Sequence, residues 1–124
     1  MNPWKVLVVE DEDDSMELVC GILEYHQIET IGAATGEDAI DMLKRGAAPN
    51  LIVVDLALPG IDGWGVLEFL KSNRALSQVP RVAITAFHSP ELAHQVIEAG
   101  FDAYFPKPID STTFVRELER IVSG

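Results

Sequence analysis

The sequence predicts a single α/β domain in which five parallel strands alternate with five helices, and the helices lie on both faces of the sheet. Three observations support this prediction. Short apolar runs recur along the chain, and each is followed by a longer stretch with apolar residues at helical spacing. The length of 124 residues is typical of one domain. A hydrophobic content of 48% is enough for a single core.

The first half of the chain is expected to hold two strands and two helices. Lys5–Val9 is a short apolar strand, and an amphipathic helix follows over residues 15–26. The acidic residues before this helix are expected to cap it and to favour its positive end. Glu29–Ala34 is a weaker second strand. Thr35 is placed to cap a helix that runs to Arg45, because its hydroxyl can accept a hydrogen bond from a free backbone amide.

The second half is expected to hold three strands and three helices. Leu51–Asp55 is the most apolar strand, and the Pro59-Gly60 pair ends it. The other elements then alternate: a helix over Gly63–Ser72, a strand over Arg81–Thr85, a helix from Ser89-Pro90 to Gly100, a strand over Ala103–Phe105, and a last helix capped by Asp110 or Ser111.

The composition excludes several classes of protein. The net charge of −11 argues against direct binding to nucleic acid, whose phosphates would be repelled. No apolar run approaches the length of a membrane span, and no signal peptide is evident at the N-terminus. The single cysteine, Cys20, cannot form an internal disulfide, and this fits a cytoplasmic location. Trp4 is expected to be peripheral.

Polar residues stand where four of the expected strands end. They are Glu10 and Asp11 after the first strand, Asp55 in the third, Thr85 in the fourth and Lys107 after the fifth. Parallel strands place their carboxyl ends along one edge, so these side chains are expected to meet there. Crowded carboxylates need a cation, and oxygen ligands of this kind suit Mg²⁺. Beside the metal, the group could hold a phosphoryl group with Asp55 as nucleophile.

Five motifs carry a resemblance to a known family. They are Glu10-Asp11, Asp55 with Leu58-Pro59-Gly60-Ile61-Asp62-Gly63, Thr85-Ala86, Tyr104, and Lys107-Pro108. Each motif alone is weak, but five in this order and at these intervals are specific. The chain resembles the CheY-like receiver domain of two-component response regulators, and the resemblance covers essentially the whole sequence, residues 1–124.

The resemblance implies a flavodoxin-like fold with the strands in the order 2-1-3-4-5. It also implies a phosphoacceptor that takes a phosphoryl group onto Asp55 from a phosphohistidine on a sensor histidine kinase or histidine phosphotransfer protein. Mg²⁺ would be held by Asp11, by Asp55, by the main-chain carbonyl of Ala57, and by Glu10 through a water molecule.

The same resemblance implies roles for the residues around the phosphoryl group. Thr85, Ala86 and Lys107 would bind its oxygens. Thr85 and Tyr104 would move after phosphorylation, and this movement would change the surface of the fourth helix, fifth strand and fifth helix that a downstream protein target recognises. The Lys107-Pro108 peptide bond is expected to be cis, as in the family.

Two positions that tune loss of phosphate in the family carry unusual side chains here. They stand two residues beyond Asp55 and two beyond Thr85, and they are Ala57 and Phe87. A methyl and a phenyl group offer no conventional hydrogen bond to an attacking water. The sequence therefore predicts slow self-dephosphorylation and a long-lived signal.

The sequence fits four other functions less well or leaves them open. A Mg²⁺-dependent phosphohydrolase with an aspartyl nucleophile would carry Asp-x-Asp after its first strand, whereas this nucleophile candidate stands in the third. A flavodoxin-like cofactor carrier would need a phosphate loop where this chain has acids. A degenerate receiver used only for docking conflicts with the complete motif set. A receiver fragment of a larger hybrid kinase or regulator stays open, although Met1 mildly favours a stand-alone domain.

Overall fold

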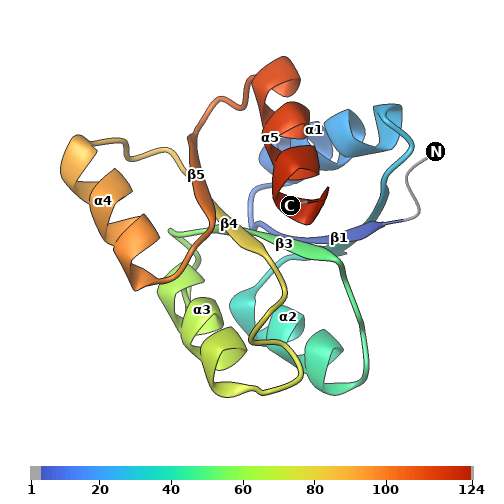
Figure 1. Cartoon of the computed structure of the whole chain (residues 1–124), viewed down its shortest axis with the longest axis vertical. Helices are drawn as coiled ribbons and strands as arrows, with labels where there is room; N and C mark the ends of the chain where they lie inside the picture. The colour runs from blue at the N-terminus through green and yellow to red at the C-terminus, as the bar shows by residue number, and fades with distance from the viewer. Residues whose placement is uncertain (1–3, 124) are drawn as a thin grey trace.

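The computed structural model describes residues 4–123, which form five strands and five helices in strict alternation (Figure 1). The strands are all parallel and lie in the order β2-β1-β3-β4-β5, which confirms the predicted fold class and strand order. The elements in chain order are β1 (Lys5–Val9), α1 (Asp13–Tyr25), β2 (Glu29–Ala33), α2 (Gly36–Lys44), β3 (Leu51–Asp55), α3 (Gly63–Ser72), β4 (Arg81–Thr85), α4 (Pro90–Ala99), β5 (Ala103–Pro106) and α5 (Ser111–Ser123).

The sheet is the middle of three layers. Helices α1 and α5 cover one face, and α2, α3 and α4 cover the other (Figure 1). Successive side chains of a strand point to opposite faces, so Leu7 and Ile52 pack toward α2–α4 while Val8 and Val53 pack toward α1 and α5. Burial on both faces explains why the central strands read as unbroken apolar runs.

Most helix starts follow the predicted capping chemistry. The Thr35 hydroxyl accepts a hydrogen bond from the Asp38 amide at 2.9 Å, and the Ser89 hydroxyl accepts one from the Leu92 amide at 3.0 Å. Asp110, rather than Ser111, caps α5, because its Oδ1 accepts from the amides of residues 112 and 113. Side-chain acceptors at these positions satisfy amides that have no partner within the helix.

The start of α1 and the place of Trp4 differ from the prediction. Helix α1 begins at Asp13, and Glu12 at its N-cap position makes no side-chain capping bond; only the acids of its first turn, Asp13 and Asp14, favour the positive end. Trp4 was expected at the periphery, but it is buried with Val6 and Val8 in the cluster beneath α1 and α5. The two-residue period of β1 extends back to Trp4 and places it on that inner face.

The carboxyl ends of the strands are fixed by hydrogen bonds that continue past the strands themselves. The Glu10 amide donates to the Ala33 carbonyl at 3.0 Å, and the Lys107 amide donates to the Thr85 carbonyl at 2.8 Å. The backbone that carries the candidate site is therefore an extension of the sheet. Within residues 4–123, no helix has the length and apolar character that crossing a membrane requires.

Candidate functional site

The centre of the site is an ammonium group held between two buried carboxylates. Lys107 Nζ lies 2.8 Å from Asp55 Oδ2 and 2.7 Å from Glu10 Oε1, and it is 3.4 Å from Glu12 Oε1. Asp55 is 4% exposed and Glu10 is 1% exposed. A charge buried this deeply requires a partner, and the lysine supplies it for both acids.

The position of Asp55 is fixed by the end of β3 and by the tight turn that follows it. All five residues of β3 are buried, and Asp55 pairs with Ile84 of β4. The Ala57 amide donates to Asp55 Oδ1 at 2.9 Å, which fixes the carboxylate plane. A Cβ at Gly63 would come within 2.7 Å of the Asp55 carbonyl oxygen, so only glycine lets α3 begin this close to the strand.

Burial and charge set the protonation behaviour of this pair. Burial raises the pKa of the Asp55 carboxyl, and the hydrogen bonds from Lys107 and the Ala57 amide oppose that rise without cancelling it, since the Glu10 carboxylate adds to it. Burial alone would lower the pKa of the Lys107 ammonium, but the two carboxylates outweigh it and the pKa of Lys107 is raised. Lys107 is therefore a permanent cation in the site.

Three carboxylates are arranged as possible metal ligands. Glu10, Asp11 and Asp55 each offer an oxygen, and these oxygens all lie within 4.8 Å of one another. Glu10 Oε2 accepts from the Glu12 amide at 3.2 Å. The other oxygen, Glu10 Oε1, is buried, and it is ion-paired with Lys107 Nζ at 2.7 Å. Oxygen donors with free acceptor capacity fit a hard cation such as Mg²⁺.

Thr85 stands at the end of β4, and its hydroxyl is engaged with the loop that follows. Oγ1 accepts from the Phe87 amide at 3.0 Å and lies 3.4 Å from the Phe87 carbonyl oxygen. The threonine is 1% exposed, while Ala86 and Phe87 are exposed. Both of these contacts are with the backbone of Phe87, so the hydroxyl ties the loop to the end of β4.

Tyr104 and the Lys107-Pro108 bond lie on β5 and just beyond it. The Lys107-Pro108 peptide bond is cis, as predicted. Tyr104 is half-buried, and its hydroxyl lies 2.8 Å from His88 Nδ1.

The structure brings the predicted residues Glu10, Asp11, Asp55 and Lys107 together, and it adds two neighbours that the sequence does not predict. The sequence indicates only helix capping for Glu12, yet its carboxylate reaches Lys107. His88 belongs to none of the five motifs, and the sequence does not predict its hydrogen bond with Tyr104. Side-chain contacts between different loops leave no periodic pattern in a sequence. Neither the Glu12–Lys107 contact nor the His88–Tyr104 contact could therefore be predicted from the residues.

Comparisons with known proteins agree with the geometry. The family described as response regulator receiver domain matches residues 6–119. The polar-differentiation response regulator DivK of Brucella anthropi is 33% identical over 117 residues, which is 94% of each chain.

Solved structures show the same similarity. The signal receiver domain of a signal transduction histidine kinase from Syntrophus aciditrophicus aligns with a TM-score of 0.88 at 27% identity, covering 98% of this chain and 91% of that one. The chemotaxis protein CheY4 of Vibrio cholerae aligns with a TM-score of 0.86 at 24% identity, covering 95% and 98%, and supports the fold alone. The span matched by the family contains every residue of the site, and the chain belongs to the family of response regulator receiver domains.

Proposed function

We propose that Asp55 is the residue that accepts the phosphoryl group in this receiver domain, with a phosphohistidine on a partner protein as the donor. The observation that carries the proposal is the position of the Asp55 carboxylate, which lies 2.8 Å from a buried ammonium and within 4.8 Å of two further acids. A nucleophile, a phosphoryl-binding cation and a set of metal ligands in one place are the parts that phosphoryl transfer requires.

The chemistry follows from these groups. An Asp55 oxygen attacks phosphorus in line, the phosphorus–nitrogen bond of the donor breaks, and its electron pair returns to the imidazole. Lys107 starts as the partner of Asp55 and then pairs with a phosphoryl oxygen, so the site keeps its cation through the reaction. Mg²⁺, held by Glu10, Asp11, Asp55 and the Ala57 carbonyl, would neutralise charge on the phosphoryl oxygens.

A switch is the proposed outcome of phosphorylation. Thr85 would give up its bonds with the backbone of Phe87 and donate to a phosphoryl oxygen beside Ala86 and Lys107. Tyr104, on the neighbouring strand, would turn toward the space that Thr85 leaves. The surface of α4, β5 and α5 would then differ between the two states and recruit a downstream protein target.

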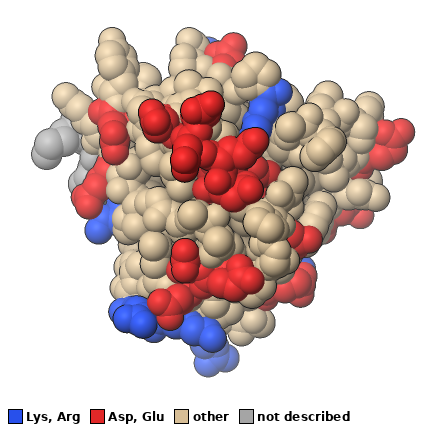
Figure 2. All heavy atoms as spheres, turned by 180° about the vertical axis from the view of Figure 1, so that it is seen from behind, with Lys and Arg blue, Asp and Glu red and all other residues tan. Residues whose placement is uncertain are grey.

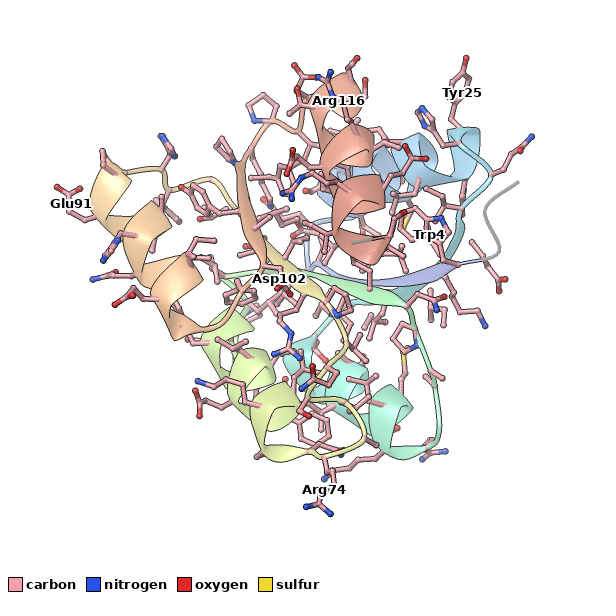
Figure 3. The ribbon with its side chains drawn as sticks, viewed as in Figure 1. Trp4, Tyr25, Arg74, Glu91, Asp102 and Arg116 are labelled. Atoms are coloured by element: carbon pink, nitrogen blue, oxygen red, sulfur yellow. The ribbon has the colours of Figure 1, made fainter. Side chains whose placement is uncertain are left out.

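The donor is proposed to dock beside the site, along α1 and α5. Two adjoining grooves support this: one is lined by Glu12, Lys107 and Leu18, and the other by Leu18, Tyr25 and Arg116. Tyr25 and Arg116 lie at the same end of the molecule (Figure 3). A sensor histidine kinase or a histidine phosphotransfer protein is the expected partner, and a cytoplasmic location stays a prediction.

The acidic surface supports a protein partner rather than nucleic acid. The chain carries 20 acidic and nine basic residues. Figure 2 shows acidic side chains gathered across the face seen from behind. We also propose that catalysis is limited to the protein's own aspartate, because the nucleophile candidate Asp55 stands at the end of β3 and the residue two positions beyond it is Ala57, so no Asp-x-Asp pattern of an aspartyl phosphohydrolase begins at the nucleophile.

The test is phosphorylation of the purified chain by acetyl phosphate and Mg²⁺, followed by intact mass. The wild type is expected to gain one phosphoryl group only when Mg²⁺ is present, and Asp55→Asn to gain none. Asp41→Asn is the matched control, because Asp41 is an exposed acid on α2 that pairs with Arg45 and is not part of the acidic cluster of the site. A phosphoryl group that appears equally on the Asp55→Asn variant would refute the assignment.

A further inference from the structure

One contact beside the site fixes the ring of Tyr104 at two points. Its hydroxyl lies 2.8 Å from His88 Nδ1, and the two rings are stacked with their centroids 5.6 Å apart and their planes 20° from parallel. His88 is exposed in the loop between β4 and α4, whereas Tyr104 is half-buried on β5. The hydrogen bond holds the tip of the tyrosine and the stack holds its face, so the ring has one preferred orientation.

The same loop is tied to Thr85. The Phe87 amide donates to Thr85 Oγ1 at 3.0 Å, and His88 is the next residue along the chain. The short segment from Thr85 to His88 is therefore anchored at one end by the threonine hydroxyl and at the other by the tyrosine hydroxyl. If Thr85 releases the Phe87 amide, the backbone that carries His88 loses one of its two anchors.

We propose that His88 is a positioning residue that latches Tyr104 in the orientation of the unphosphorylated protein and thereby opposes the switch; this rests on the proposed function of Asp55, Thr85 and Tyr104. The latch makes the resting state more favourable. A ligand shifts a two-state equilibrium only by the difference in its interaction free energy with the two states. Part of the free energy of phosphoryl binding must therefore offset the loss of the His88–Tyr104 contact.

The state of the tyrosine supports this role. Burial raises the pKa of the Tyr104 hydroxyl more than a hydrogen bond with the Ser89 backbone lowers it, so the hydroxyl stays protonated at neutral pH and available to hydrogen-bond with the imidazole. Among the described residues, His94 offers a natural comparison. It is also exposed, but it lies on α4 and its ring is 4.0 Å from Glu98, away from the tyrosine.

The experiment measures the affinity for beryllofluoride, a phosphoryl analogue, by calorimetry with saturating Mg²⁺. His88→Ala removes the bond and the stack, and Tyr104→Phe removes the hydroxyl, with its contacts to His88 Nδ1 and the Ser89 backbone, but keeps the stack. Loss of one hydrogen bond from the resting state is expected to tighten beryllofluoride binding about fivefold in either variant. His88→Asn restores an oxygen close to the place of Nδ1 and is expected to return the affinity toward the wild-type value. His94→Ala is the control and is expected to bind as the wild type does.

The double variant separates a latch from an unrelated effect. If His88 acts through Tyr104, His88→Ala combined with Tyr104→Phe gains little more than His88→Ala alone. The proposal is overturned if folded His88→Ala binds beryllofluoride as the wild type does or more weakly, or if the two gains add in full. A wild type that binds no beryllofluoride in the presence of Mg²⁺ overturns the proposed function, and the latch falls with it. Thermal unfolding of each variant confirms that it is folded.

Discussion

At the scale of single residues, the site depends on one lysine that neutralises two buried acids. Lys107 Nζ lies within 2.8 Å of an oxygen of Asp55 and of Glu10, and its side chain is only 14% exposed. Removing one partner of a buried ion pair is costly, because the remaining charge is left in a poor solvent. An exposed pair such as Arg45–Asp41 contributes little, since water and salt screen it.

Lys107→Ala is therefore expected to lower the free energy of unfolding, without Mg²⁺, by about 3 kcal/mol, because two acids then face each other without a cation. Urea denaturation measures the change. Arg45→Ala is the control, with an expected loss below about 1 kcal/mol. Equal losses in the two variants would mean that Lys107 does not neutralise the site.

The lifetime of the phosphorylated state is predicted to depend on Ala57 and Phe87, because neither side chain can orient an attacking water. Phe87 is 70% exposed, so a longer polar side chain at this position would find room beside the site. Phe87→Gln is expected to shorten the lifetime of the aspartyl phosphate about tenfold, which corresponds to about 1.4 kcal/mol of barrier. Mass spectrometry over time measures the decay, and Phe87→Leu is the apolar control. A wild-type lifetime of seconds with Mg²⁺ would contradict the prediction.

At the scale of elements, the start of α2 holds the loop that follows β3. A Cβ at Gly36 would clash with the carbonyl oxygen of Ile61. Beside it, the Ile61 amide donates to Glu37 Oε2 at 3.3 Å. Gly60 has a φ of 68°, a conformation that glycine adopts without strain. The loop that carries the Ala57 carbonyl is thus shaped by contacts from a different element.

Gly36→Ala is expected to destabilise the fold by about 2 kcal/mol, because the clash is with backbone that cannot rotate away. It is also expected to slow phosphorylation by acetyl phosphate, since the loop must shift. Gly21→Ala is the control: apart from its chain neighbours and the nearby backbone of its own helix, no described atom lies within 4 Å of its added Cβ, and alanine in a helix is favoured by up to about 1 kcal/mol. Thermal unfolding measures the stability of the two variants against the wild type. A Gly36→Ala protein as stable as the wild type would contradict the packing argument.

Elements were predictable from sequence where a local rule fixes them. The caps at Thr35 and Ser89 and the turn at Pro59-Gly60 depend on a few adjacent residues, and the structure confirms them. The strand order depends on which strands meet in space, so alternation alone could not supply it and the family resemblance did. The buried guanidinium of Arg81, which donates to three carbonyls of the loop before β4, also depends on contacts that the sequence does not record.

The candidate site was predictable for a different reason. Parallel strands gather their carboxyl ends along one edge, so residues far apart in sequence, such as Asp11, Asp55 and Lys107, meet by topology. The sequence does not determine which oxygen faces which nitrogen. The engagement of the Thr85 hydroxyl with residue 87 and of Tyr104 with His88 emerges only from the packed structure.

At the scale of the whole molecule, the chain carries a net charge of −11, and three of its acids lie close together in the candidate site. A ligand that binds only the folded state stabilises it. Mg²⁺ is therefore expected to raise the free energy of unfolding by about 1.4 kcal/mol when present at about ten times its Kd. Asp11→Asn is expected to lose most of this gain, because Asp11 is an exposed acid of the cluster. NaCl at matched ionic strength controls for screening, and an equal gain from NaCl would refute a specific site.

The most direct test of the account is to find the residue that carries the phosphoryl group. The chain is phosphorylated with acetyl phosphate and Mg²⁺, reduced with borohydride, which converts an aspartyl phosphate to homoserine, and digested for peptide mass analysis. The account predicts that the converted residue is Asp55 and no other acid. Conversion at Asp11 or another acid, or a phosphoryl group on His88 in place of Asp55, would contradict it.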